Sequence, residues 1–189
     1  METKSLRCKI TGVEPLIMHN GQLANPLSKG AQELKKLSGK RKKTDADLWE
    51  LAHTEWFYGL YTENGKLILP AEVCEATLVE AAKKSRRGKQ AKFGIRVSEN
   101  GILEYDGPVD LGELWKDERF RFQAMVRVQQ SRILRTRPIF PTWATEFTVL
   151  YQDDVFPERE VIDILTVAGD QIGFGDWRPK YGRFEVEIL

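Results

Sequence analysis

Hydrophobic and polar residues alternate in four segments of the chain. In residues 4–11, Leu6, Cys8 and Ile10 fall on one face, which is the two-residue period of a half-buried strand. Residues 120–128 alternate in the same way, with the apolar side chains of Phe120 through Val128 expected to face inward. Residues 146–152 and 184–189 complete the set. The pattern predicts four strands.

Apolar residues recur every three to four positions in two other segments, which predicts two amphipathic helices. Residues 71–84 follow Pro70, a residue that favours the first turn of a helix, and residues 157–168 begin at Pro157 and are expected to end at Gly169. Shorter patterns predict further helices at 31–37 and 45–58, the second opened by a capping box of Thr44 and Asp47.

The order strand, helix, strand, strand, helix, strand predicts an α+β fold with a ferredoxin-like, RRM-like split βαβ core. We expect residues 1–189 to form a single domain with basic loop and helical insertions at about 13–60 and 85–118. The insertion at 85–92, SRRGKQAK, is expected to be a mobile basic loop, and FGIRV with the following ILEY a hairpin. In this fold one face of the sheet stays open, and RNA-recognition domains place aromatic and basic side chains there.

Composition excludes several classes of protein. No apolar run approaches the roughly 20 residues that span a bilayer, and the N-terminal segment lacks the apolar stretch of a signal peptide, so we expect a cytoplasmic protein with no membrane contact. Cys8 and Cys74 fall on buried faces and are interpreted as small hydrophobic residues rather than zinc ligands. We expect no metal and no cofactor.

The net charge of +1 hides a strong segregation of charges along the chain. Most of the 29 Lys and Arg residues lie in four windows that contain no Asp or Glu, namely residues 34–44, 81–98, 119–145 and 177–184. Solvated loops and helix faces would explain any one such window. Together they predict a surface that binds a polyanion on a nearly neutral protein.

The segment GFGDWRPKYGRF, residues 173–184, combines glycines, cations and aromatics just before the last predicted strand. Its glycines permit positive φ and close backbone approach, its cations can neutralise phosphates, and Trp177 and Tyr181 offer flat stacking faces. This chemistry suits single-stranded nucleic acid. A turn whose aromatics cap the core is the alternative reading. It is not a dinucleotide fingerprint, because no helix follows the glycines.

This segment resembles the C-terminal glycine-rich motif of the RAMP superfamily, the RRM-like proteins of CRISPR effector complexes. CKITGVEPLIM resembles the first strand of that family and the loop after it, and KLILPAEVCEATLVEAAKK resembles its strand-proline-helix element. Ala71-Glu72-Val73 stands where the family begins this helix with a Gly-Ser-Ser-Lys-Gly-like sequence, which indicates a divergent or phage-borne relative.

The resemblance implies a non-catalytic protein that assembles side by side along RNA or single-stranded DNA, as an oligomer or filament or with other CRISPR subunits. It points to the glycines and arginines of the loop and, by position, to a hairpin at 132–137, while the charge windows supply the remaining cations. The candidate nucleic-acid-binding residues are Lys40, Arg41, Lys42, Lys43, Lys83, Lys84, Arg86, Arg87, Lys89, Lys92, Arg132, Arg135, Arg137, Gly173, Gly175, Trp177, Arg178, Lys180, Tyr181, Gly182 and Arg183.

Two alternatives remain. The processing nucleases of the same superfamily use histidine chemistry, so an endoribonuclease would employ His19, in a loop after the first strand, as a general base. His53, within a predicted helix, is interpreted as structural or solvent-facing. The other alternative is an interaction protein or inhibitor that mimics a CRISPR subunit and uses its basic windows to meet an acidic partner.

Overall fold

The computed structural model describes residues 2–189, and the chain divides into two compact units. Unit 1 comprises the residues up to Leu16, Thr62–Asp106 and Pro141–Leu189. Unit 2 comprises Ile17–Tyr61 and Gly107–Phe140. No helix in the described residues is both long enough and apolar enough to cross a membrane.

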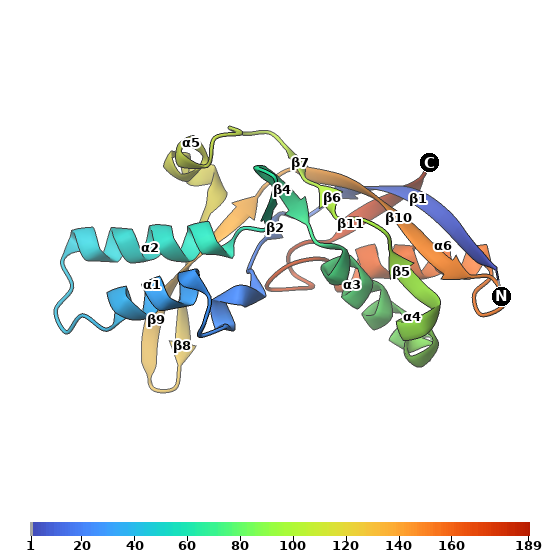
Figure 1. Ribbon diagram of the computed structural model, residues 1–189, viewed down its shortest axis with the longest axis horizontal. Helices are drawn as coiled ribbons and strands as arrows, with labels where there is room; N and C mark the ends of the chain where they lie inside the picture. The colour runs from blue at the N-terminus through green and yellow to red at the C-terminus, as the bar shows by residue number, and fades with distance from the viewer. Residues whose placement is uncertain (1) are drawn as a thin grey trace. The chain divides into compact units, whose positions relative to one another are not determined.

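Unit 1 is built on an antiparallel sheet with the strand order β11-β1-β10-β5 (Figure 1). These strands are β1 (Thr3–Gly12), β5 (Ile95–Val97), β10 (Trp143–Gln152) and β11 (Phe184–Ile188), and β7 (Glu104–Tyr105) also pairs with β10. Two helices, α3 (Ala71–Lys84) and α6 (Glu158–Val167), connect β1 to β5 and β10 to β11. This chain order and strand order define the ferredoxin-like split βαβ topology. The predicted α+β, ferredoxin-like fold is therefore confirmed.

One strand of the predicted core was assigned wrongly. The second core strand is β5, which pairs with β10 through Ile95 to Val97, and the segment 120–128 belongs to unit 2. That segment forms β8 (Arg121–Val128), in which Phe122, Ala124 and Val126 are only half-buried. A two-residue period marks any half-buried strand and does not say which strand is its neighbour.

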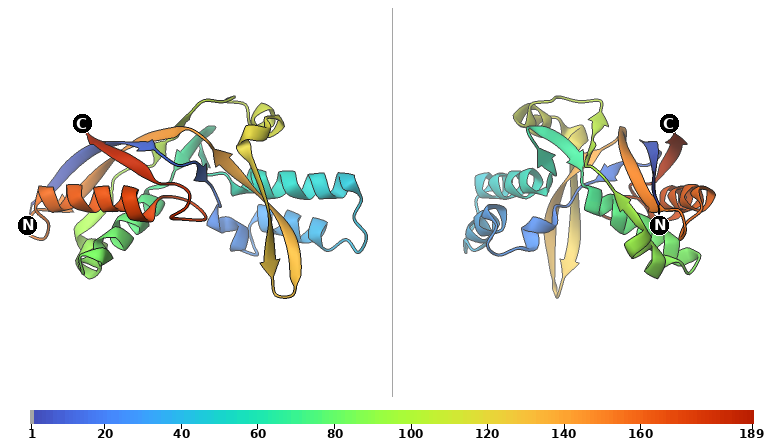
Figure 2. Two further views of the ribbon diagram at one scale, coloured as in Figure 1. Left: turned by 180° about the vertical axis from the view of Figure 1, so that it is seen from behind. Right: turned by 45° about the vertical axis from the view of Figure 1, so that its right-hand side comes forward.

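The core of unit 1 lies between the sheet and its two long helices, which cover the same face (Figures 1 and 2). Alternate residues of the two central strands point into it, including Cys8 and Ile10 of β1 and Phe147 and Val149 of β10, each at most 1% exposed. The helix α3 has the predicted bounds. It follows Pro70, and the side chain of Asn100 accepts a hydrogen bond from its first backbone N–H, at 2.9 Å.

The basic segment after α3 is helical, in contrast to the mobile loop that was expected. It forms α4 (Gly88–Gly94), with Ala91 fully buried. The α6 helix ends at Val167, one residue before the predicted Ala168, and a π-helical turn, Ala168–Ile172, that was not predicted follows it. A small second sheet has the strand order β3-β4-β6, formed by β3 (Thr62–Glu63), β4 (Lys66–Leu69) and β6 (Gly101–Ile102).

Unit 2 combines two helices with a long β-hairpin. The helices are α1 (Lys29–Ser38) and α2 (Asp45–Gly59), and the hairpin consists of β8 and β9 (Ser131–Phe140), next to β2 (Leu16–Ile17), whose second residue belongs to this unit. The short elements are the 3-10 turns Gly21–Ala24 and Glu118–Phe120 and the helix α5 (Leu111–Lys116). The predicted capping box is present, with Thr44 and Asp47 exchanging hydrogen bonds at the start of α2.

The helix α2 packs along β9, and the tip of the hairpin extends away from the helix (Figure 2). Trp56 of α2 is fully buried, and its indole N–H donates to the carbonyl of Phe120 at 2.8 Å. Glu55, one residue earlier, is the only acidic side chain among the buried residues that the structure describes. The hydrogen bonds of this carboxylate are described below, since they bear on the arginines of the hairpin.

Candidate nucleic-acid interface

The end of α3 and the whole of α4 carry four cations that are exposed and make no ion pair in residues 2–189. These residues, which we name the α3–α4 cation cluster, are Lys84, Arg86, Lys89 and Lys92. Arg86 adopts φ +62° in the short link between the helices. Phe93, directly after Lys92, is 58% exposed. The cluster therefore combines clustered positive charge with an aromatic ring in solvent, as single-strand-binding surfaces do.

Two other predicted cations of this segment are held within unit 1. The Arg87 Nε donates to Glu160 Oε1 at 2.9 Å, a second guanidinium nitrogen donates to the carbonyl of Val155, and the guanidinium lies 4.7 Å from the ring centroid of Phe156. Lys83 pairs with Glu80 at 2.6 Å, one helical turn away. Arg87 therefore fastens α4 to the start of α6, which explains why this segment is ordered.

The glycine-rich loop folds back on itself. Gly182 has φ +74°, its N–H donates to the carbonyl of Pro15 at 2.8 Å, and its carbonyl accepts from Phe174 N–H at 2.9 Å. A Cβ at Gly182 would collide with the carbonyl of Phe174. The ring of Phe174 is fully buried and stacks on Phe184 with 4.4 Å between centroids. Gly173 and Gly175 also have positive φ angles, +77° and +79°. The close backbone approach that the glycines permit is thus an approach within the chain.

The cations of this loop differ in their contacts. Arg183 pairs with Glu14 at 2.8 Å, and Arg178 donates from Nη1 to the Thr77 hydroxyl of α3 at 3.4 Å. Lys180 is exposed, and its ammonium lies 5.6 Å from the ring centroid of Tyr181. Trp177, 41% exposed, lies edge-on to Tyr181 with 6.4 Å between centroids. Trp177, Arg178 and Lys180 are exposed parts of the loop, and Tyr181 is half-buried.

The loop and the α3–α4 cation cluster meet along α3. The pKa of Glu80 on this helix is lowered, first by the hydrogen bond from Lys83 and then by the positive charges of Arg178 and Lys84. Arg178 and Lys84 therefore both lie near one exposed carboxylate. Two segments that are about 90 residues apart in the sequence contribute to one basic region of unit 1.

The open face of the sheet in unit 1 is less basic than the fold analogy suggested. Arg7 pairs with Glu146 at 2.9 Å, and Lys9 lies 3.8 Å from Glu104. The register pairs Lys9 with Glu187 across β1 and β11. The outward positions of β1, β10 and β11 hold no aromatic side chain. These described strands therefore lack the stacking platform that RNA-recognition domains carry on this face.

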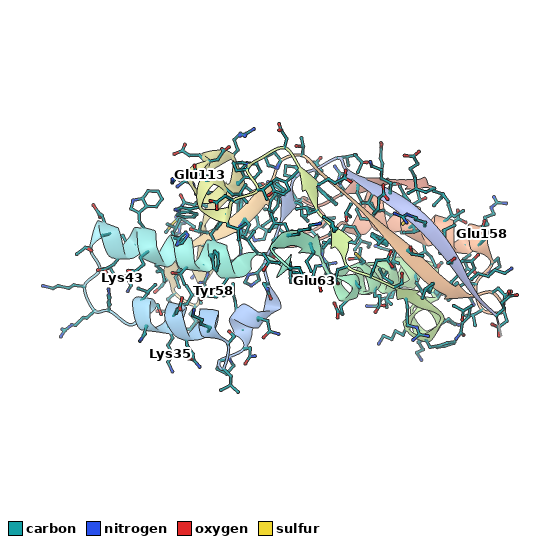
Figure 3. The ribbon with its side chains drawn as sticks, turned by 45° about the horizontal axis from the view of Figure 1, so that its top comes forward. Lys35, Lys43, Tyr58, Glu63, Glu113 and Glu158 are labelled. Atoms are coloured by element: carbon teal, nitrogen blue, oxygen red, sulfur yellow. The ribbon has the colours of Figure 1, made fainter. Side chains whose placement is uncertain are left out.

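In unit 2, the basic run Lys40–Lys43 forms the loop between α1 and α2, and Figure 3 shows Lys43 at this end of the two helices. The ammonium of Lys43 donates to the carbonyls of Ser38 and Lys40, at 2.8 and 2.9 Å, and thereby caps the end of α1. Lys40 pairs with Asp47. Arg41 and Lys42 are exposed and make no ion pair within the described chain.

Of the three predicted arginines of β9, two form ion pairs and one is exposed. Arg135 and Arg137 both donate to Glu55 Oε1, at 3.1 and 2.7 Å, and the second oxygen of Glu55 accepts from the backbone N–H of Thr136 at 2.8 Å. Arg132 lies near the tip, exposed and directly opposite Arg127 in the register of the hairpin. Arg127 was not among the predicted residues, although it lies in the same window without acids.

The histidines occupy different surroundings within unit 2. His53 packs against Trp115 at 4.9 Å and Trp56 at 6.5 Å between ring centroids, and burial lowers its pKa. His19 follows β2 and is half-buried, and its backbone carbonyl accepts from the hydroxyl of Tyr61 at 3.0 Å. Residues 2–189 contain no group of three or more His, Cys, Asp or Glu side chains that could hold a metal ion.

Half of the predicted cations thus make a hydrogen bond or an ion pair within the chain. These are Lys40, Lys43, Lys83, Arg87, Arg135, Arg137, Arg178 and Arg183. The other half are exposed and make no ion pair in the described residues, namely Arg41, Lys42, Lys84, Arg86, Lys89, Lys92, Arg132 and Lys180. The largest local group of this second set is the α3–α4 cation cluster.

Comparison with known proteins supports the fold. No protein-family profile and no curated protein sequence matches the chain. Among solved structures it is similar to a chain of "Cryo-EM structure of the Type III-B Cmr-beta bound to cognate target RNA", with a TM-score of 0.52 and 12% sequence identity. The similarity covers 100% of this chain and 61% of that chain, so this chain spans about three fifths of its length. At 12% identity the likeness is one of fold.

Proposed function

We propose that this protein binds single-stranded nucleic acid without cleaving it, as a divergent relative of the RAMP proteins of CRISPR effector complexes. The observation that carries the proposal is the α3–α4 cation cluster, in which Lys84, Arg86, Lys89 and Lys92 are exposed beside Phe93. Exposed cations that make no ion pair are free to replace the counterions of a phosphate backbone. The Cmr-beta likeness adds a related fold from an RNA-bound complex.

In this proposal the ferredoxin-like unit is the scaffold of one RAMP-type domain, with 17–61 and 107–140 as its insertions. Copies assemble side by side along RNA or single-stranded DNA, or beside other CRISPR subunits. Because the open sheet face has no aromatic residues, the strand follows the basic helices and loops instead. Contacts to phosphates position a strand without reading its sequence, so binding is expected to be largely independent of sequence.

The test is a salt titration of binding to fluorescent strands of about 30 nucleotides, long enough for several binding sites. Changing all four residues of the α3–α4 cation cluster to Gln should weaken binding to every strand. The slope of log affinity against log salt should fall by about 0.7 for each lost phosphate contact. A control variant with the same loss of charge carries Gln at Lys29, Lys66, Lys116 and Arg159, which are exposed and lie outside the cluster.

Equal weakening in the two variants would mean that total charge, and not the cluster, governs binding. Mass measurements on strands of increasing length test side-by-side assembly, since the number of bound copies should rise with length. Recovery of the strand after incubation tests the alternative endoribonuclease, whose cleavage should require His19. If neither RNA nor DNA binds at low salt, where electrostatic attraction is strongest, the interaction-protein alternative replaces this proposal.

A further inference from the structure

A groove in unit 2 runs between α2 and the β8–β9 hairpin and has a volume of about 220 Å³. Its lining residues come from the first turns of α2 and from the middle of both strands: Asp45, Leu48, Trp49, Ala52, Gln123 and Leu134. Leu48, Trp49 and Leu134 are 46%, 54% and 43% exposed, and Met125, the register partner of Leu134, is 60% exposed. Together these residues form an unusually apolar surface for solvent-facing positions.

Trp49 is exposed and at the same time held in place. Its ring meets the ring of Trp115 edge-on, with 6.4 Å between centroids. The guanidinium of Arg121 lies 5.5 Å from the centroid of Trp49 and 5.1 Å from that of Trp115. The Arg121 side chain is only 13% exposed, and its buried Nε has no hydrogen-bond partner among the described atoms. A fixed, exposed indole offers a stacking surface at a small entropic cost on binding.

Two polar side chains line the groove, Gln123 and Asp45. The side-chain amide of Gln123 donates to the Thr136 hydroxyl at 3.3 Å, and its carbonyl oxygen is a hydrogen-bond acceptor. Asp45 adds a carboxylate. Acceptors beside a flat apolar surface match the exocyclic amino group of a base, as in the pairing of Asp or Glu with the amino group of cytosine.

Cations lie beside the groove on the same face of the hairpin. Because side chains alternate along a strand, Arg127 shares a face with Met125 and Gln123, and Arg132 shares it with Leu134. Arg132 is two residues from Leu134, roughly 7 Å along the strand, within reach of the phosphate of a nucleotide in the groove. Residues 119–145 contain no Asp or Glu, and Asp45 is the acidic side chain that lines the groove.

We propose that this groove binds one unpaired nucleobase with an exocyclic amino group, stacked on Trp49, while Arg127 and Arg132 contact the neighbouring phosphates. The inference rests on the proposed single-strand binding, and it adds a base contact where that proposal has only phosphate contacts. Gln123 and Asp45 favour cytosine over uracil, two bases of one size that differ in an amino or a carbonyl group at the same ring position.

The experiment measures the affinity of the full chain for oligo(C), oligo(U) and a strand of abasic sites of equal length. The variant Trp49→Leu should bind oligo(C) about 5- to 150-fold more weakly, which is the range for the loss of one base–aromatic stack. It should bind the abasic strand as tightly as the parent and keep the parent's salt slope. Gln123→Leu should reduce the preference for oligo(C) over oligo(U). Phe57→Leu is the matched control, an aromatic on the same helix, 41% exposed and outside the groove.

Trp49→Phe keeps a flat ring and should retain part of the affinity, whereas a variant that fails to fold would lose abasic binding as well. A thermal melt of each variant identifies that case, and then crosslinking of 5-iodocytosine strands to the parent, mapped to Trp49 or elsewhere, decides the question. If the parent binds strands but Trp49→Leu and Phe57→Leu bind oligo(C) equally well, the groove holds no base and the proposed function stands without it. If the parent binds no strand, the proposed function itself fails, and the base-binding groove fails with it.

Discussion

Replacing Glu55 by Ala should destabilise unit 2 more than any exposed substitution on the same helix. The carboxylate is buried, with Glu55 6% exposed. It accepts hydrogen bonds from Arg135, Arg137 and the backbone N–H of Thr136. Its removal takes from Arg137, whose side chain is 11% exposed, the carboxylate that accepts its hydrogen bond at 2.7 Å. It also leaves the N–H of Thr136, a residue 1% exposed, without its acceptor.

The magnitude follows from these contacts. Breaking a buried ion pair by removing one partner costs about 3–5 kcal/mol. The lost acceptor of Thr136 is part of the same perturbation and is not added separately. Arg135 contributes little, because its side chain is 39% exposed and water can solvate it. We therefore expect Glu55→Ala to lower the free energy of unfolding by about 3–5 kcal/mol, and Arg137→Gln to be more damaging than Arg135→Gln.

Urea unfolding followed by tryptophan fluorescence measures this change, since Trp49, Trp56 and Trp115 lie in unit 2. Glu50→Ala is the matched control, because Glu50 is an exposed residue of the same helix, and it should alter stability by less than about 0.5 kcal/mol. The argument is refuted if Glu55→Ala is as stable as Glu50→Ala. Such a result would mean that water solvates the two arginines as well as Glu55 does.

Three further predictions concern single residues. Gly182→Ala should destabilise the protein more than Gly65→Ala in thermal melts, because both glycines have positive φ but only a Cβ at Gly182 meets backbone; equal losses would contradict this geometry. Burial lowers the pKa of His53, so the folded state takes up a proton on this side chain less readily than the unfolded state. The free energy of unfolding should therefore fall as the pH drops below about 6.5. In urea titrations, His53→Phe should flatten this pH dependence. Burial raises the pKa of Cys8 to about 12 and also raises that of Cys74, so a thiol reagent should label neither in native protein at mildly alkaline pH and both in urea; rapid native labelling would show that the thiols are accessible.

In unit 1, the periodicity of the sequence predicted where helices and strands lie better than it predicted which strands pair. The bounds of α3 follow from Pro70 and a regular apolar face, which are local signals. The partner of a strand is a non-local property, and for that reason residues 120–128 were placed in the wrong sheet. FGIRV, which contains β5, was expected to form a hairpin with ILEY, whereas β5 pairs with β10. The helix α4 was missed because glycines and cations suggest a loop, whereas the contact from Arg87 to Glu160 that fixes it spans 73 positions.

The charge windows located the cations of the candidate site and could not reveal which of them are engaged. Arg183 pairs with Glu14 across 169 positions, and Arg137 pairs with Glu55 across 82. An acid-free window excludes only acidic residues that are near in sequence, and long-range folding supplies the others. Trp49 had no signal beyond its aromatic ring, since its exposure depends on where the hairpin crosses α2.

The position of β1 in its sheet affects how the chain folds during synthesis. The strand β1 pairs with two strands that lie far downstream in the chain, from Thr3 opposite Gln152 in β10 to Gly12 opposite Phe184 in β11. At about 5–20 residues per second, β1 waits roughly 7–26 s for its first partner, β10. Both segments of unit 2 are translated before β10, so the hairpin and its helices can form while β1 is still unpaired. During that interval the apolar face of β1 is exposed to chaperones and to other nascent chains.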